Sequence, residues 1–129
     1  MSDIPSMDEW LREAKDEPDA GMCGIYLVHN GTVRQSSRAK VREGADDNRT
    51  VIGMNLSFDE DKVQEAICEA SEMPGVYYVR AWLNEGCLNT GDDIMYVMIG
   101  ADTRSNASSA LDGLVGTLKN SCITEEEVF

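Results

Sequence analysis

Apolar residues recur at the three- to four-residue spacing of an amphipathic helix in two stretches of the chain. The first stretch covers Ser57–Ser71 and ends before Pro74-Gly75, a strong helix stop. The second covers Ser105–Lys119. Each stretch predicts a helix with one buried face. The apolar positions are Val63, Ala66, Ile67 and Ala70 in the first helix and Ala107, Ala110, Leu111, Leu114, Val115 and Leu118 in the second.

A shorter helix is predicted near the N-terminus. Ser6 and Glu9 have the spacing of a capping box, in which each side chain accepts a hydrogen bond from the other residue's backbone N–H. We expect this helix to run to about Lys15, with Trp10 on its apolar face, and to end before Pro18.

Four β-prone apolar runs predict strands at Gly24–His29, Val51–Leu56, Val76–Leu83 and Ile94–Ile99. Asn30-Gly31 is a type I′ turn signal between the first run and a following extended segment. The order of elements is strand, strand, helix, strand, strand, helix. It indicates an α+β fold, a mostly antiparallel sheet with helices packed on one side.

The chain has 129 residues, enough for one domain over 1–129, with an N-terminal helix and linker over 1–20. Residues 35–50 have little apolar content, and we expect a mobile loop there. The basic residues Arg34, Arg38, Lys40, Arg42 and Arg49 fall in or next to this loop. The pattern fits an anion-binding loop or a solvated polar loop, and the sequence leaves both open.

Charge and cysteine content limit the classes of function. Lys and Arg total 11 against 24 Asp and Glu, a net charge of −13, which opposes binding to nucleic acid or to an anionic membrane. Met1-Ser2-Asp3 opens an acidic and not an apolar N-terminus, so we expect no signal peptide. No apolar run approaches the roughly 20 residues of a membrane helix. Four cysteines without a CxxC motif indicate free thiols in the cytoplasm.

The other candidate chemical groups have simple structural interpretations. Asp92 and Asp93 follow Thr90-Gly91 and indicate turn chemistry rather than a metal site. His29 lies in an apolar run and is expected in the core or at a sheet edge.

Cys23 and Cys68 are expected to be buried. Three glutamates beside Cys122 should raise the pKa of its thiol.

Several motifs in a fixed order resemble the large, catalytic subunit of molybdopterin synthase (MoaE-like). The resemblance covers about Gly21 to Lys119. It is carried by His29-Asn30-Gly31-Thr32-Val33-Arg34, the Ser57–Ser71 helix, Pro74-Gly75-Val76, Trp82-Leu83-Asn84-Glu85-Gly86-Cys87-Leu88, Thr90-Gly91-Asp92-Asp93-Ile94, Thr103-Arg104-Ser105 and the final helix to Leu118-Lys119.

The resemblance implies an α/β hammerhead type of fold and a homodimer. It also implies a small ubiquitin-like sulfur-carrier subunit as partner, whose Gly-Gly tail carries a thiocarboxylate. Sulfur would pass from this tail to a cyclic pyranopterin phosphate in molybdenum cofactor biosynthesis, with no bound cofactor.

Three site residues carry over from the family. Arg34 and Arg104 match substrate-binding arginines, and Lys119 matches a catalytic lysine. A guanidinium can hold a phosphate by two parallel hydrogen bonds, and an ammonium can stabilise charge at a thiocarboxylate. We therefore expect the three cations to meet in one anion-binding pocket. The alternatives are a surface ion pair for each arginine and a helix-dipole lysine at 119.

Three departures from the family pattern put full catalysis in question. Glu126 stands at the offset of the family's second lysine, and Thr103 replaces a histidine before Arg104. The chain also stops at Phe129, where relatives continue with more basic residues. The sequence therefore leaves two hypotheses. One is a sulfurtransferase, and the other is a catalytically impaired homologue that binds or regulates a ubiquitin-like partner.

Overall fold

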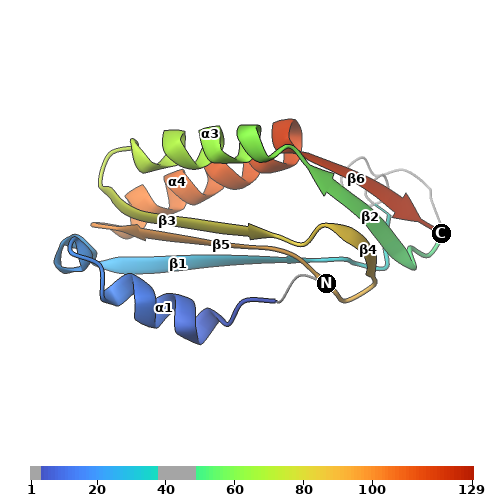
Figure 1. Ribbon diagram of the computed structural model, residues 1–129, viewed down its shortest axis with the longest axis horizontal. Coiled ribbons are helices and arrows are strands. Elements are labelled where there is room, and N and C mark those ends of the chain that lie inside the picture. Colours follow the sequence, from blue (N-terminus) through green and yellow to red (C-terminus); the bar gives the residue numbers. More distant parts are fainter. Residues whose placement is uncertain (1–3, 38–48) are drawn as a thin grey trace.

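The chain folds into two three-stranded antiparallel sheets with helices on both faces of the larger one (Figure 1). The computed structural model describes residues 4–37 and 49–129. The helices are α1 (Met7–Lys15), α3 (Glu60–Ser71) and α4 (Arg104–Thr117), with a 3₁₀ turn η1 (Ala20–Met22) and a π-helical turn η2 (Leu118–Cys122). The strands are β1 (Ile25–Thr32), β2 (Gly53–Phe58), β3 (Val76–Leu83), β4 (Gly86–Asn89), β5 (Asp93–Ala101) and β6 (Ile123–Val128).

The larger sheet has the order β1-β5-β3. Its central strand β5 is almost wholly buried, because helices cover both of its faces. Ile25 of β1 and Val76 of β3 both pair with Ala101, and Leu83 of β3 pairs with Met95. Both pairings are antiparallel, as the sequence predicts.

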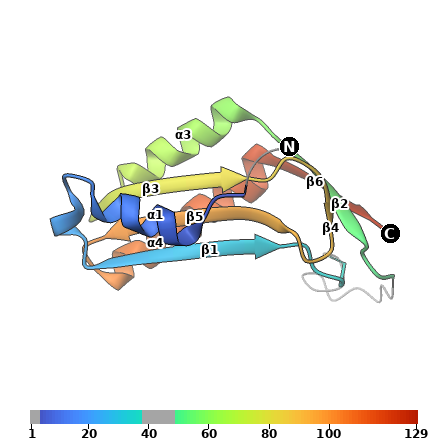
Figure 2. The same cartoon turned by 60° about the horizontal axis from the view of Figure 1, so that its bottom comes forward.

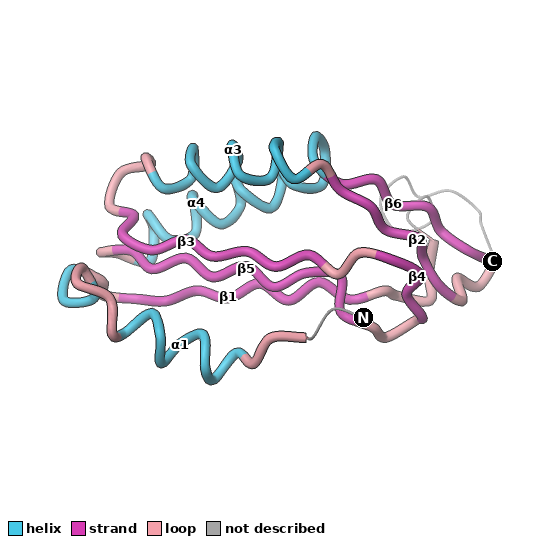
Figure 3. The backbone as a smooth tube through the Cα atoms, in the orientation of Figure 1, coloured by secondary structure: helices cyan, strands magenta, loops and turns pink. Residues whose placement is uncertain are grey.

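The smaller sheet has the order β4-β2-β6 and lies beyond the end of the larger one (Figure 3). Gly53 in the central strand pairs with Asn89 on one side and with Val128 on the other. The C-terminal segment thus closes the sheet against a strand that lies far away in the sequence. One apolar cluster extends across both sheets, since Leu56, Leu88 and Val97 all belong to it.

The two long helices pack on one face of the larger sheet, and α1 packs on the other (Figure 2). Asp59 caps α3 by accepting a hydrogen bond from Lys62 N at 3.2 Å. Below the sheet, Trp10 of α1 is buried against Met98 and lies edge-on to Tyr96 at 6.2 Å between ring centroids. Arg80 of β3 lies over the Trp10 ring at 4.4 Å. These contacts hold α1 in place.

The predicted fold class is confirmed, and several elements lie where the sequence places them. The strand Val76–Leu83 has the predicted bounds. At the N-terminus, Ser6 caps the predicted helix by accepting from Glu9 N at 3.4 Å. The two long helices share one face as expected, and α1 adds a layer on the opposite face.

The turn predicted at Asn30-Gly31 is wrong. Strand β1 continues through both residues, which pair with Tyr96 and Met95 of β5. The Asn30 side chain donates to the carboxylate of Asp93 at 3.0 Å, which ties it to the neighbouring strand. A long partner strand therefore overrides the local turn preference.

Three elements of the C-terminal half were not predicted. β4 lies inside a polar linker, and β6 is the glutamate-rich tail. Leu118–Cys122 forms a π-helical turn where an ordinary helix end was expected. Element boundaries also move by up to three residues, and α3 starts at Glu60 rather than Ser57.

Only the two ends of the predicted 35–50 loop belong to the described structure, because residues 38–48 lie outside it. The ends are held together, since Val51 N donates to Gln35 O at 2.8 Å and Ser36 bridges to Thr50. Arg38, Lys40 and Arg42 fall in the part that is not described. Among the described residues, no helix has the length and apolar character that crossing a membrane requires.

Candidate functional site

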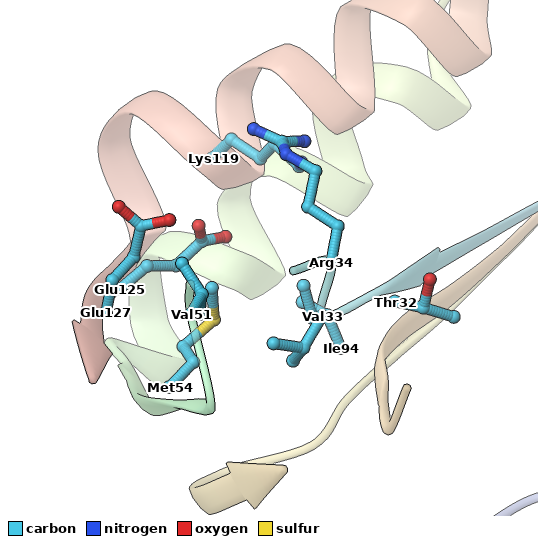
Figure 4. A pocket seen from close by; sticks show the side chains of 9 residues that line it. All are labelled: Thr32, Val33, Arg34, Val51, Met54, Ile94, Lys119, Glu125 and Glu127. Atoms are coloured by element: carbon cyan, nitrogen blue, oxygen red, sulfur yellow. The ribbon is translucent and has the colours of Figure 1, made fainter. Parts of the chain in front are cut away.

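A pocket lies where the two sheets meet the end of α4 (Figure 4). Its floor is apolar and well packed, because Val33, Val51 and Ile94 are each no more than 4% exposed. Charged side chains surround this apolar floor. The residues that line the pocket are Thr32, Val33, Arg34, Val51, Met54, Ile94, Lys119, Glu125 and Glu127.

Arg34 reaches the pocket from the segment that follows β1. Val33 is fixed by two backbone hydrogen bonds, donating to Asp92 O at 3.0 Å and accepting from Gly91 N at 2.8 Å. The next side chain is therefore held at the pocket rim. Arg34 Nε donates to Ser36 O at 3.2 Å, and the guanidinium extends toward the side chain of Lys119 (Figure 4).

Lys119 reaches the pocket from the π-helical turn η2. Such turns are rare and occur frequently at functional sites. Leu118 and Cys122, on either side of the lysine, are buried and anchor the turn in the core. Figure 4 shows the Lys119 and Arg34 side chains extending toward the same region of the pocket. Two of the three predicted site cations therefore meet.

Arg104 does not join them within one chain. It is the first residue of α4 and is exposed, whereas Lys119 follows the opposite end of this helix. At 1.5 Å per residue, the two positions are about 22 Å apart along the helix axis. The expectation that all three cations share one pocket of a single chain is therefore wrong.

Glu126 stands at the sequence offset of the family's second lysine, but its side chain does not line the pocket. Side chains alternate between the two faces of a strand. In β6, Glu126 is exposed, whereas Glu125 and Glu127 are half-buried and line the pocket. The pocket thus does contain carboxylates, but from the two neighbouring residues. With Arg34 and Lys119 the lining carries two positive and two negative formal charges, so it is not the purely cationic site that was expected.

His29 lies beside the site, although the sequence indicated only a structural role. It lines a second hollow together with Lys119 and Asp112, and Arg34 is not among the residues that line this hollow. Its Nε2 is buried and has no hydrogen-bond partner among the described residues. Burial lowers the pKa of His29, and the nearby charge of Lys119 lowers it further. The signal that could have indicated this position is its place on the strand that leads to Arg34.

Thr103, where the family has a histidine, caps α4 by accepting from Asn106 N at 3.2 Å. Asp92 accepts from Asn89 N at 2.8 Å, which confirms the predicted turn. Within the described ranges, no cluster of three or more His, Cys, Asp or Glu residues could hold a metal ion.

The cysteines differ in part from expectation. Cys23 is partly buried, but Cys68 is exposed on α3, so its predicted burial is wrong. Cys122 is buried, and burial is the main reason that the pKa of its thiol is raised. The acidic residues that contribute are Asp59, Glu65 and Glu69, not the glutamates of the tail.

The fold is shared with solved structures of molybdopterin synthase proteins. Molybdopterin synthase from Staphylococcus aureus superposes with a TM-score of 0.73 at 18% identity, over 97% of this chain and 86% of the other. The molybdopterin biosynthesis MoaE protein from Burkholderia ambifaria gives 0.72 at 19% identity, over 98% and 84%. One chain of a structure described as the complex of subunits 1 and 2 of molybdopterin-converting factor from Helicobacter pylori gives 0.65 at 18% identity, over 95% and 78%.

No curated protein matches this chain in sequence. The family model described as MoaE protein, however, matches residues 3–121. This range includes Arg34, Arg104 and Lys119, and it covers most of the chain. The resemblance seen in the sequence is thereby confirmed, and the chain belongs to the MoaE protein family.

Proposed function

We propose that this chain is the large subunit of a molybdopterin synthase and acts in molybdenum cofactor biosynthesis. The observation that carries the proposal is the meeting of Arg34 and Lys119, two residues distant in sequence, in one pocket. The family model and the structural matches support the same assignment. A complex of the two molybdopterin-converting factor subunits among those matches supports a small partner subunit.

In the proposed reaction the partner's thiocarboxylated Gly-Gly tail enters the pocket, and its sulfur forms a bond to a carbon of the cyclic pyranopterin phosphate. Water then cleaves the bond between this sulfur and the acyl carbon of the tail, which leaves the tail as a carboxylate. Arg34 binds an anionic group by charge-assisted hydrogen bonds. The ammonium of Lys119, which lines the same pocket, stabilises the charge that develops on the thiocarboxylate oxygen during transfer. The buried apolar floor limits access of water from below.

Arg104 can serve this pocket only from a second copy of the chain, because α4 separates it from Lys119 within one molecule. The homodimer expected from the family offers such an arrangement. An Arg104→Ala variant that stays dimeric and loses activity supports this role, whereas full activity assigns Arg104 to the surface.

Reconstitution tests the proposal. The chain is mixed with a thiocarboxylated small partner and the cyclic pyranopterin phosphate, and dithiolene product is measured. We expect Lys119→Ala to lower turnover by about 10²- to 10⁴-fold. Arg34→Ala should lower kcat/KM by about 10- to 100-fold through lost charge-assisted hydrogen bonds.

Matched controls lie on α1, across the larger sheet from the pocket. Lys15→Ala and Arg12→Ala remove the same charges from exposed positions and should leave turnover unchanged. Absence of product with a verified partner and substrate would contradict the enzymatic proposal.

A second function is favoured by Glu125 and Glu127, which offset the two cations of the pocket. The chain could then bind or regulate a ubiquitin-like partner without turnover. Titration calorimetry with a Gly-Gly-tailed partner, together with the product assay, separates the two functions. Binding without product formation supports the binding or regulatory function alone. Glu126→Lys should not restore activity, since this side chain faces away from the pocket.

A further inference from the structure

The pocket has an acidic half that the proposed sulfur transfer does not use. Glu125 and Glu127 enter it from β6, opposite Leu56 and Met54 in strand register. They lie on one side of the apolar floor, and Arg34 and Lys119 lie on another (Figure 4). A purely anionic ligand would be repelled by this half.

Glu125 is the more informative of the two residues. Its Oε1 is buried, and the described residues offer it no hydrogen-bond partner. A buried carboxylate oxygen without a donor is costly, so such groups are normally paired in the functional state. A ligand that enters the pocket with an N–H group would supply this donor.

The proposed substrate carries such donors. The pyrimidinone ring of a pterin presents an exocyclic 2-amino group next to a ring N–H. These two parallel donors match the two oxygens of a carboxylate, as the donors of a guanidinium do. The phosphate at the other end of a pyranopterin phosphate matches the cationic half of the pocket.

We propose that Glu125 recognises the aminopyrimidinone edge of the pterin, while Arg34 and Lys119 hold its anionic end. This inference rests on the proposed function and deepens it. The buried side chains of Val33, Val51 and Ile94 form an apolar surface for the flat ring between the two halves. Glu127 adds negative charge to the same side and strengthens the attraction for N–H donors.

A pair of fluorescent probes tests this assignment. One is a pterin phosphate, and the other is the matching 2,4-dioxopteridine phosphate, in which a carbonyl replaces the 2-amino group. We expect the unmodified protein to bind the pterin phosphate about 10- to 100-fold more tightly, because the analogue leaves Glu125 without its donor. Glu125→Gln should remove most of this preference.

Glu126→Gln is the matched control. It makes the same chemical change one residue away in the same strand, on the exposed face, and should keep the preference intact. Thermal unfolding of both variants shows whether they remain folded. Equal affinity of the unmodified protein for the two probes, or an unchanged preference in Glu125→Gln, overturns the inference.

The outcomes separate this inference from the proposed function. If both probes bind equally and binding depends on Arg34 and Lys119, the proposed function stands and the role of Glu125 is refuted. If neither probe binds, the substrate class itself is refuted. If Glu125→Gln weakens only binding of the Gly-Gly-tailed partner, the carboxylate serves the peptide, and the pterin assignment is overturned.

Discussion

At the residue scale, the environment of His29 shows how the fold changes the chemistry of a side chain. It is the single histidine of the sequence, it is partly buried, and it lines a hollow together with Lys119. Burial disfavours the imidazolium, and the positive charge of Lys119 disfavours it further, so the pKa of His29 is lowered. The unfolded chain therefore binds this proton more readily than the folded protein.

This difference predicts a pH dependence of stability. Below a pH of about 6.5 the unfolded state gains the proton first, so the free energy of unfolding should fall as the pH drops toward the lowered pKa of the folded state. His29→Phe should flatten the dependence in this window. Urea unfolding at several pH values measures the effect, and an unchanged slope in the variant would contradict it.

Residue-scale chemistry also separates the three glutamates of the tail. They are equivalent in composition, and the sequence pointed to Glu126 as the residue in the site. The alternation of β6 instead turns its neighbours inward. A strand in this tail could have been predicted only from its partner β2, because glutamates have low strand propensity.

At the scale of elements, the sequence predicted best those helices and strands that carry a clear hydrophobic or β-prone pattern of their own. Val76–Leu83 can be recognised as a strand from its own sequence, because it is a long β-prone run that polar residues follow. β4 and β6 are not, since their hydrogen bonds go to β2 and their sequences are polar. The π-helical turn at Lys119 has no sequence signal at all.

The start of α4 allows a prediction at this scale. Thr103 departs from the family pattern and acts as the helix N-cap through its hydrogen bond with Asn106 N. Thr103→Ala should lower the free energy of unfolding by about 1 kcal/mol. Thr103→Ser keeps the hydroxyl and should lose little. Denaturant titration measures both variants, and equal losses would argue against the cap.

At the scale of the whole molecule, the charge distribution is uneven. The net charge of −13 repels polyanions in general, while the pocket gathers Arg34 and Lys119 into a local cationic group. This contrast predicts that the protein binds a small anion in preference to a nucleic acid. The acidic half of the same pocket restricts the expected ligands further, to anions that also carry N–H donors.

The sheet topology gives a prediction about assembly. Among the described strands, β1 forms one edge of the larger sheet and pairs only with β5. An unpaired edge of this length invites pairing with another chain, which agrees with the homodimer expected from the family. Sedimentation at micromolar concentration should therefore give twice the chain mass of 14.2 kDa. A monomeric mass would contradict both the dimer and the proposal that Arg104 of a second copy reaches the pocket.

The sequence by itself determined the fold class, the family and the three helices, and it predicted Arg34 and Lys119 as site residues. These features depend on local periodicity or on motifs read along the chain. Only the tertiary structure decided that these two cations meet, that Arg104 lies elsewhere, and that Glu125 rather than Glu126 faces the pocket. The physical reason is that each of these relations depends on strand register, on the length of α4 or on the direction of a side chain. All of these are fixed by packing between segments that are distant in the chain.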